Sequence, residues 1–210
     1  MALHSIGIIG AGWLGGSVGR AIAAAGHDVL FASRHPERIK HLTEDLPSSR
    51  VGTLVAAAGQ DIVLLSTPFD ALEGVAAQYG AALTGKILID ATNPPGRSAA
   101  GREGERIGVA QLVRDMFPDT RLVRCFSAVD ATCIEEGHGY GEAGPLGVPL
   151  ASDDAEALAT VCALVRDADC VPVPTGALET ARLFQRGAAA FRANTNAARL
   201  RDLMGLAQAA

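Results

Sequence analysis

Three glycines near the start of the chain, Gly10, Gly12 and Gly15, have the G-x-G-x-x-G spacing of a phosphate-binding turn. They follow an apolar run at residues 5–9 and lead into a stretch of helical composition. The first glycine of such a turn permits the bend, the second lets main chain approach a pyrophosphate, and the third allows close strand–helix packing. The motif predicts a dinucleotide site at Gly10, Ala11, Gly12, Trp13, Leu14 and Gly15. A glycine-rich turn without a ligand is the alternative.

The end of the next apolar run, residues 28–32, indicates which dinucleotide would bind. Ser33, Arg34 and, further on, Arg38 follow it, and no carboxylate stands at the strand end. A carboxylate there would accept hydrogen bonds from the ribose 2′-OH of NAD, whereas an arginine pairs with an additional phosphate. Ser33, Arg34 and Arg38 therefore favour NADP(H). In the alternative, Arg34 is a solvated surface charge and Ser33 only caps a helix.

Three later strand ends are expected to border the same crevice, because ligands of open parallel sheets bind beyond the carboxyl ends of the strands. Pro68 and Pro94 are equally compatible with simple strand termination. The predicted cofactor-binding residues at these ends are Ser66, Thr67, Pro68 and Phe69, then Asn93 and Pro94, and finally Ala128 and Val129.

The elements that would position these residues alternate between strand and helix, which is typical of an α/β, Rossmann-like, doubly wound and mostly parallel sheet. We expect one domain over residues 1–210, with a small C-terminal helical extension at about 177–210. Residues 135–144 are a predicted loop, and residues 96–108 are expected to form a loop or the start of a mobile helix. The predicted strands are 5–9, 28–32, 61–66, 86–90, 121–127, 147–151 and 170–174, and the predicted helices are 14–25, 36–46, 71–83, 109–116, 153–166 and most of the chain after 177.

Composition limits the possible classes of protein. The 210 residues are 49% hydrophobic and carry a net charge of −5, which argues against a disordered chain and against a nucleic-acid binder. Residues 1–19 contain no Asp, Glu, Lys or Arg, but their glycines and the lack of a basic start argue against a membrane helix or a signal peptide. We expect a soluble cytoplasmic protein.

No convincing catalytic or metal-binding group is visible. The four cysteines lack metal spacing and are expected to be free thiols, with two disulfides as the alternative. Ser17 lies in a G-x-S-x-G pattern, but inside the predicted helix rather than at a nucleophile elbow. Glu135, Glu136, His138 and Glu142 are expected to form a solvated acidic loop or a lid rather than a metal site.

A family resemblance rests on seven segments. They are residues 6–15, 32–34, 61–69, 89–95, 124–128, 148–154 and 175–183, and the last is similar to a late Gly-x-Leu-x-x-Ala-Arg signature. Together these segments resemble the coenzyme F420-dependent NADP reductases. The relatives of that family include the N-terminal oxidoreductase domain of the six-transmembrane metalloreductases.

The resemblance implies cofactor contacts at Ala11, Gly12, Trp13 and Leu14, and contacts to the 2′-phosphate from Ser33, Arg34 and Arg38. It also implies direct hydride transfer between the nicotinamide of NADPH and a deazaflavin (coenzyme F420) or flavin-like acceptor, and a homodimer formed through the C-terminal helix. Such a transfer needs no protein nucleophile. The chain departs from the family pattern at Phe126, Ser127 and residues 137–144, where the second substrate would lie.

Two other functions stay open. One is an NADPH-dependent reductase of a small imine or carbonyl substrate, such as pyrroline-carboxylate reductase, although those enzymes append a long helical dimerisation domain and only residues 178–210 follow Ala177 here. The other is a non-catalytic redox sensor that only holds NADPH.

Overall fold

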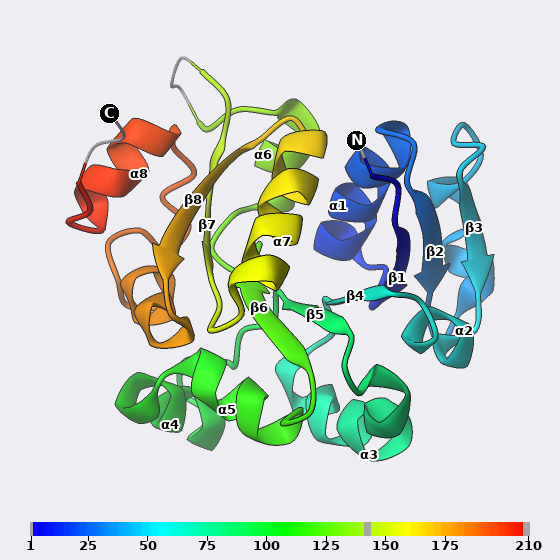
Figure 1. The fold of residues 1–210 in the computed structure, drawn as a ribbon, viewed down its shortest axis with the longest axis horizontal. Helices are drawn as coiled ribbons and strands as arrows, with labels where there is room; N and C mark the ends of the chain where they lie inside the picture. The colour runs from blue at the N-terminus through cyan, green and yellow to red at the C-terminus, as the bar shows by residue number, and fades with distance from the viewer. Residues whose placement is uncertain (1, 141–143, 208–210) are drawn as a thin grey trace.

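A computed structural model describes residues 2–140 and 144–207 and contains one sheet in the order β3-β2-β1-β4-β5-β6-β7-β8 (Figure 1). Neighbouring strands are parallel except for β6 and β7, which are antiparallel. The α/β fold is therefore confirmed as mostly parallel. The strands are β1 (Ser5–Ile9), β2 (Asp28–Ala32), β3 (Ser49–Gly52), β4 (Ile62–Leu65), β5 (Ile87–Asp90), β6 (Arg121–Cys125), β7 (Gly147–Ala151) and β8 (Val171–Gly176).

Helices cover both faces of the sheet, as its uninterrupted apolar strands require. One core layer lies under α1 (Trp13–Ala24), α6 (Ala131–Glu136) and α7 (Ala155–Asp167). The other lies under the remaining helices, with α4 packed on α5 (Figure 1). These are α2 (Leu54–Ala58), α3 (Leu72–Leu83), α4 (Ala99–Ile107), α5 (Val109–Met116) and α8 (Ala197–Leu203). Among residues 2–140 and 144–207, no helix combines the length and apolarity needed to cross a membrane.

The strand order reverses at β1, which lies between β2 and β4. The chain passes outward through β2 and β3 and then returns to place β4 on the other side of β1. Loops that leave β1 and β4 therefore diverge at their carboxyl ends and open a crevice between them. The glycine turn at residues 10–15 lies at this switch point.

The predicted helix at 36–46 is wrong. Two short 3₁₀ turns, Pro36–Arg38 and Lys40–Leu42, replace it, and β3 and α2 follow without having been predicted. The strand β3 is a half-exposed sheet edge, so it lacks the apolar run that made the central strands recognisable.

Of the two interpretations of residues 96–108, the structure supports the helix, because α4 occupies most of this stretch. Ser98 caps this helix by accepting a hydrogen bond from the Gly101 N–H at 2.9 Å. A Cβ on Gly101 would lie 2.3 Å from the Pro95 carbonyl oxygen, and one on Gly104 would lie 2.7 Å from the Val109 side chain. These glycines permit close packing inside a helix, although in the sequence they resemble loop residues.

Two further predictions need correction. Glu135 and Glu136 belong to the end of α6 rather than to a loop, and Glu142 lies outside the described residues. The chain after 177 forms a 3₁₀ helix at Leu178–Phe184 and the short α8, with turns between them. Left-handed backbone at Arg192 (φ 55°) and Asn194 (φ 46°) interrupts any longer helix there.

Candidate functional site

The glycine turn has the geometry of a phosphate-binding loop. Gly10 has φ +96°, and a Cβ there would lie 2.6 Å from Ser66 backbone atoms, so the turn and β4 approach too closely for a side chain. A Cβ on Gly15 would lie 2.4 Å from the Gly10 carbonyl oxygen. Gly12, by contrast, has nothing within 4 Å of such a Cβ. Two of the three glycines are needed for the fold, and the third leaves open space at the start of α1.

The start of α1 suits an anion. Gly12 is the N-cap residue, no side chain of the described residues caps the helix, and its first turn contains no acidic residue. The first N–H groups of a helix lack intrahelical partners and carry the positive end of the helix dipole. The pyrophosphate of a dinucleotide fits this arrangement by charge and by the open approach at Gly12.

We expect Gly12→Ala to affect NADPH binding and Gly10→Ala to affect the stability of the fold. The methyl group at Gly12 enters open space, so the melting temperature is expected to stay near wild type while NADPH binding weakens by about 1–3 kcal/mol. The methyl group at Gly10 would meet backbone atoms at a residue with positive φ, so Gly10→Ala should lower the free energy of unfolding by about 1–3 kcal/mol. Thermal unfolding without ligand and NADPH titration measure the two effects. Equal destabilisation by both changes would contradict these roles.

A cleft of about 450 Å³ lies beside this turn, at the carboxyl ends of β1, β2 and β4. It collects Gly10, Ala11, Gly12, Ser33, Arg34, Arg38, Thr67 and Pro68 from the predicted cofactor site. It also contains residues that the sequence analysis missed, among them Leu54, Val75, Gln78 and Tyr79. These come from α2 and α3, and no phosphate or ribose motif marks them, because apolar side chains that flank a nucleotide resemble ordinary core residues.

Positive charge gathers at the β2 end of this cleft. Within the described residues Arg34 forms no ion pair or hydrogen bond, and Arg38 only reaches Glu37 at 3.9 Å. Ser33 Oγ accepts a hydrogen bond from the His35 N–H at 3.1 Å, which shapes the turn. Arg34 is exposed at the cleft and free to pair with a phosphate.

In the part of the chain that the structure describes, two buried hydroxyls near the strand ends have no hydrogen-bond partner, Thr67 Oγ1 and Ser127 Oγ. A buried polar group without a partner costs about 1–3 kcal/mol. Thr67 lines the cleft beside the glycine turn, so a polar group of a bound nucleotide would satisfy its hydroxyl. This orphaned atom is a further sign that the cleft fits a polar ligand.

A buried ion pair fixes the ends of β5 and β6. Arg124 (1% exposed) pairs with Asp90 (0%) and donates to Asn93 Oδ1 at 2.9 Å. Asn93 Nδ2 in turn donates to the Ser127 carbonyl oxygen at 2.7 Å. The amide of Asn93 is thus engaged within the protein on both sides. Its predicted contact with the cofactor stays a prediction, whereas its role in ordering the two strand ends is visible.

A second, smaller cleft of about 290 Å³ lies on the other side of the α1 start. The predicted residues Trp13, Leu14 and Val129 line it together with Asp130, Ala131, Thr132, Tyr140 and Arg192. Arg192 Nε donates to Asp130 Oδ1 at 2.5 Å, and this bond lowers the pKa of the Asp130 carboxyl, against the effect of its burial. Sequence analysis missed Tyr140 and Arg192, because only the fold brings residues 140 and 192 beside the glycine turn.

The remaining predicted residues line neither cleft. Phe69 and Ala128 are buried in the core, at 5% and 2% exposure, and Pro94 borders a small hollow beside Gln185 and Arg186. Ser66 and Gly15 support the turn by packing, since a Cβ on Gly15 would lie 3.1 Å from Ser66 Cβ. The side chains of Phe69, Ala128 and Pro94 pack at the strand ends, and their predicted contact with the cofactor stays a prediction.

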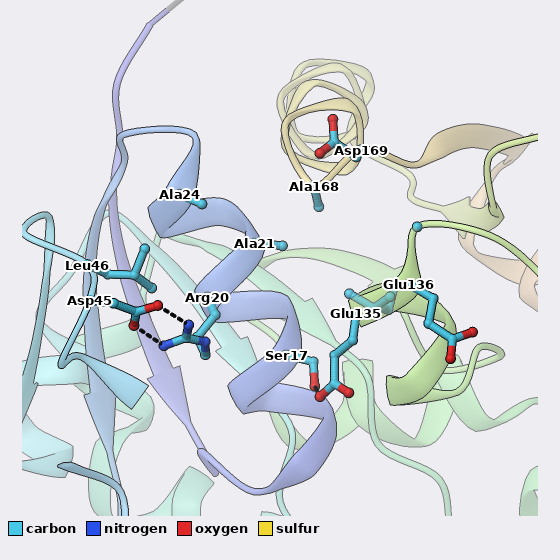
Figure 2. A pocket seen from close by; sticks show the side chains of 12 residues that line it. Ser17, Arg20, Ala21, Ala24, Asp45, Leu46, Glu135, Glu136, Ala168 and Asp169 are labelled. Carbon is cyan, nitrogen blue, oxygen red and sulfur yellow. Dashed lines mark hydrogen bonds and ion pairs between the residues drawn. The ribbon is translucent and has the colours of Figure 1, made fainter. Parts of the chain in front are cut away.

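A larger hollow, about 620 Å³, lies elsewhere, between α1, α6 and the end of α7 (Figure 2). Carboxylates of Asp45, Glu135, Glu136 and Asp169 line it, and its arginine, Arg20, is held by Asp45 at 2.7 Å. A dinucleotide is itself anionic, so this acidic hollow is a poor cofactor site despite its size.

Thiol and metal chemistry find no support in the described residues. All four cysteines are free and buried. Burial raises the pKa of Cys125, Cys133 and Cys162, and raises that of Cys170 to about 12, so these thiols stay protonated and poorly nucleophilic. Across residues 2–140 and 144–207, no cluster of three His, Cys, Asp or Glu side chains could hold a metal ion.

A comparison with known protein families indicates the class of enzyme that the chain resembles. Residues 5–94 match the family described as NADP oxidoreductase, coenzyme F420-dependent. These residues resemble the NADP oxidoreductase domain of that family. The matched segment runs from β1 to the turn after β5, so it contains the glycine turn, Arg34 and Thr67. The family resemblance seen in the sequence is thereby confirmed, and the chain is an NADP-dependent oxidoreductase.

Solved structures share the fold over most of the chain. A hypothetical protein from Sinorhizobium meliloti is 23% identical, with a TM-score of 0.74, and the match covers 93% of each chain. A protein from Arthrobacter sp. FB24, provisionally named an F420-dependent NADP-reductase, is 22% identical, with a TM-score of 0.70, over 85% of this chain and 87% of that one.

A more distant match is a pyrroline-5-carboxylate reductase from Coxiella burnetii, which is 15% identical with a TM-score of 0.63. That match covers 86% of this chain but 62% of the Coxiella reductase. At these identities the solved structures demonstrate a shared fold. No curated protein sequence matches the chain.

Proposed function

We propose that the chain exchanges hydride between NADP(H) and a deazaflavin, coenzyme F420, or a flavin-like acceptor. The cleft beside the glycine turn carries the proposal, because one hollow joins the open backbone of Gly12 to the unpaired guanidinium of Arg34. The first feature suits a pyrophosphate and the second suits the phosphate that distinguishes NADP from NAD.

Each part of the site has a separate task. The start of α1 binds the pyrophosphate, Ser33 and Arg34 bind the 2′-phosphate, and Leu54 and Tyr79 flank the adenosine. The ends of β5 and β6, beyond Trp13, would hold the nicotinamide ring, and the bound dinucleotide would supply or accept the hydride. The protein orients the two rings and excludes water, so no side chain is needed as a nucleophile.

The test follows NADPH absorbance while purified protein is mixed with candidate acceptors. Turnover with coenzyme F420 or FMN, and a preference for NADPH over NADH, is the expected result. Turnover with pyrroline-5-carboxylate alone would favour the imine reductase alternative. Tight NADPH binding without turnover on any acceptor would favour the redox sensor. Absence of NADPH binding would overturn the whole proposal.

We further propose that residues 1–210 form one domain and that the protein is located in the cytoplasm. We also propose that it forms a homodimer through the C-terminal helix α8. Light scattering of the purified protein tests the dimer, and a monomeric mass at the protein concentrations of the activity assay would contradict it.

A further inference from the structure

Trp13 is the one tryptophan of the chain, and its side chain is unusual in being both exposed and fixed. It is 69% exposed, yet its Nε1 donates a hydrogen bond to Glu135 Oε1 at 3.1 Å. Ser17 Oγ lies 2.6 Å from the same carboxylate oxygen and 2.8 Å from the Trp13 carbonyl oxygen. The hydroxyl has one proton, so it serves one of these acceptors at a time.

These contacts join two helices that the sequence places far apart. Trp13 and Ser17 belong to α1, whereas Glu135 belongs to α6. Figure 2 shows the Glu135 carboxylate turned toward Ser17, away from the neighbouring Glu136. Within the described residues, Glu136 makes no hydrogen bond or ion pair. Of these two adjacent glutamates, Glu135 therefore accepts a hydrogen bond from the indole and Glu136 does not.

The fixed indole borders the smaller cleft described above. Of the large apolar side chains that are exposed in the described residues, two are aromatic, Trp13 and Tyr140, and both line this cleft. Aromatic faces stack favourably on other planar rings. A volume of about 290 Å³ suits a ring system rather than a whole cofactor. Arg192 adds positive charge at the rim and leaves its terminal guanidinium nitrogens without a partner among the described residues.

We infer that Trp13 is a stacking wall for the planar ring of the hydride acceptor, and that Glu135 is a positioning residue that holds its indole in place. This inference rests on the proposed function and deepens it, since it names the side chains that would hold the acceptor ring. A freely rotating indole would lose conformational entropy on stacking, and the Glu135 bond removes part of that cost before the ring arrives.

The single tryptophan allows a test without turnover. Riboflavin, added without NADPH, is expected to quench Trp13 fluorescence in a saturable way. In Glu135→Ala, the fluorescence anisotropy of Trp13 should fall and its quenching by acrylamide should rise. Riboflavin affinity should fall about 3- to 10-fold, as expected for one lost hydrogen bond. Glu135→Gln keeps an acceptor oxygen and should restore most of the wild-type behaviour, and Glu136→Ala is the matched control.

The outcomes separate this inference from the proposed function. If Glu135→Ala and Glu136→Ala leave Trp13 anisotropy equally unchanged, Glu135 does not hold the indole. If Trp13→Ala weakens NADPH binding but leaves riboflavin binding intact, the indole shields the pyrophosphate instead. Both results would overturn the inference while NADPH titration of the wild type still supports the function. Failure of NADPH binding would refute the function, and the anisotropy comparison would still decide the role of Glu135.

Discussion

Replacing Asp90 by alanine is expected to lower the free energy of unfolding by about 3–5 kcal/mol, because it leaves the Arg124 guanidinium charged and unpaired in the core. Arg124 is 1% exposed and its nearest alternative acceptor is Asn93. The same Asp90 carboxylate also accepts hydrogen bonds from the Thr92 N–H at 2.9 Å and the Thr92 hydroxyl at 2.7 Å. Its loss therefore also loosens the strand end that leads to Asn93. Urea unfolding of the purified protein measures the effect.

The control is an ion pair of the same residue types on the surface. Asp28 and Arg50 pair across β2 and β3, at 51% and 47% side-chain exposure. Asp28→Ala is expected to cost less than about 1 kcal/mol, because water solvates the arginine that remains. A similar loss for Asp28→Ala and Asp90→Ala would show that burial does not determine the cost. Replacing both Asp90 and Arg124 by apolar residues should recover part of the stability, since no buried charge then remains.

Arg34→Ala is expected to weaken NADPH binding by about 1.5–3 kcal/mol, which is the range for a hydrogen bond to a charged group. This corresponds to a Kd roughly 10- to 150-fold higher. NADH lacks the 2′-phosphate, so its affinity should change little. Parallel titrations with both nucleotides measure the change in preference. Equal losses for NADPH and NADH would show that Arg34 does not read this phosphate.

Arg114 provides a control for a general loss of positive charge. It is half-exposed, pairs with Asp153 at 3.1 Å, and lines none of the described clefts. Arg114→Ala should leave the affinities for NADPH and NADH unchanged. Ser33→Ala should reduce the preference for NADPH less than Arg34→Ala does, because the Ser33 hydroxyl is neutral and already accepts a bond from His35.

The central strands and the glycine turn could be predicted because their signals are local. Residues 5–9 are a continuous apolar run, and Gly10 marks the bend directly after them, so a strand and a turn follow from neighbouring residues. The edge strand β3 and the helix α4 could not be predicted in the same way. One is half-exposed, and the other contains glycines required by contacts with Pro95 and Val109.

The nucleotide-binding half of the candidate site could be predicted from the sequence for the same reason, since Gly12 and Arg34 each follow a recognisable strand. The proposed acceptor half depends on contacts over long separations in the chain. Trp13 meets Glu135 across 122 positions, and Arg192 meets Asp130 across 62. Such pairs leave no periodic pattern, so residues like Tyr140 become candidates only after the fold is known.

The reversed direction of β7 has a consequence for substrate choice. Because β7 runs antiparallel to β6, its amino end reaches the edge of the sheet where the parallel strands finish. The segment ahead of β7 therefore supplies Tyr140 to a wall that the first five strands do not build. If the proposed acceptor cleft is correct, changes at Tyr140 would alter the preferred electron acceptor without affecting NADP(H) binding, so the two parts of the site could diversify separately.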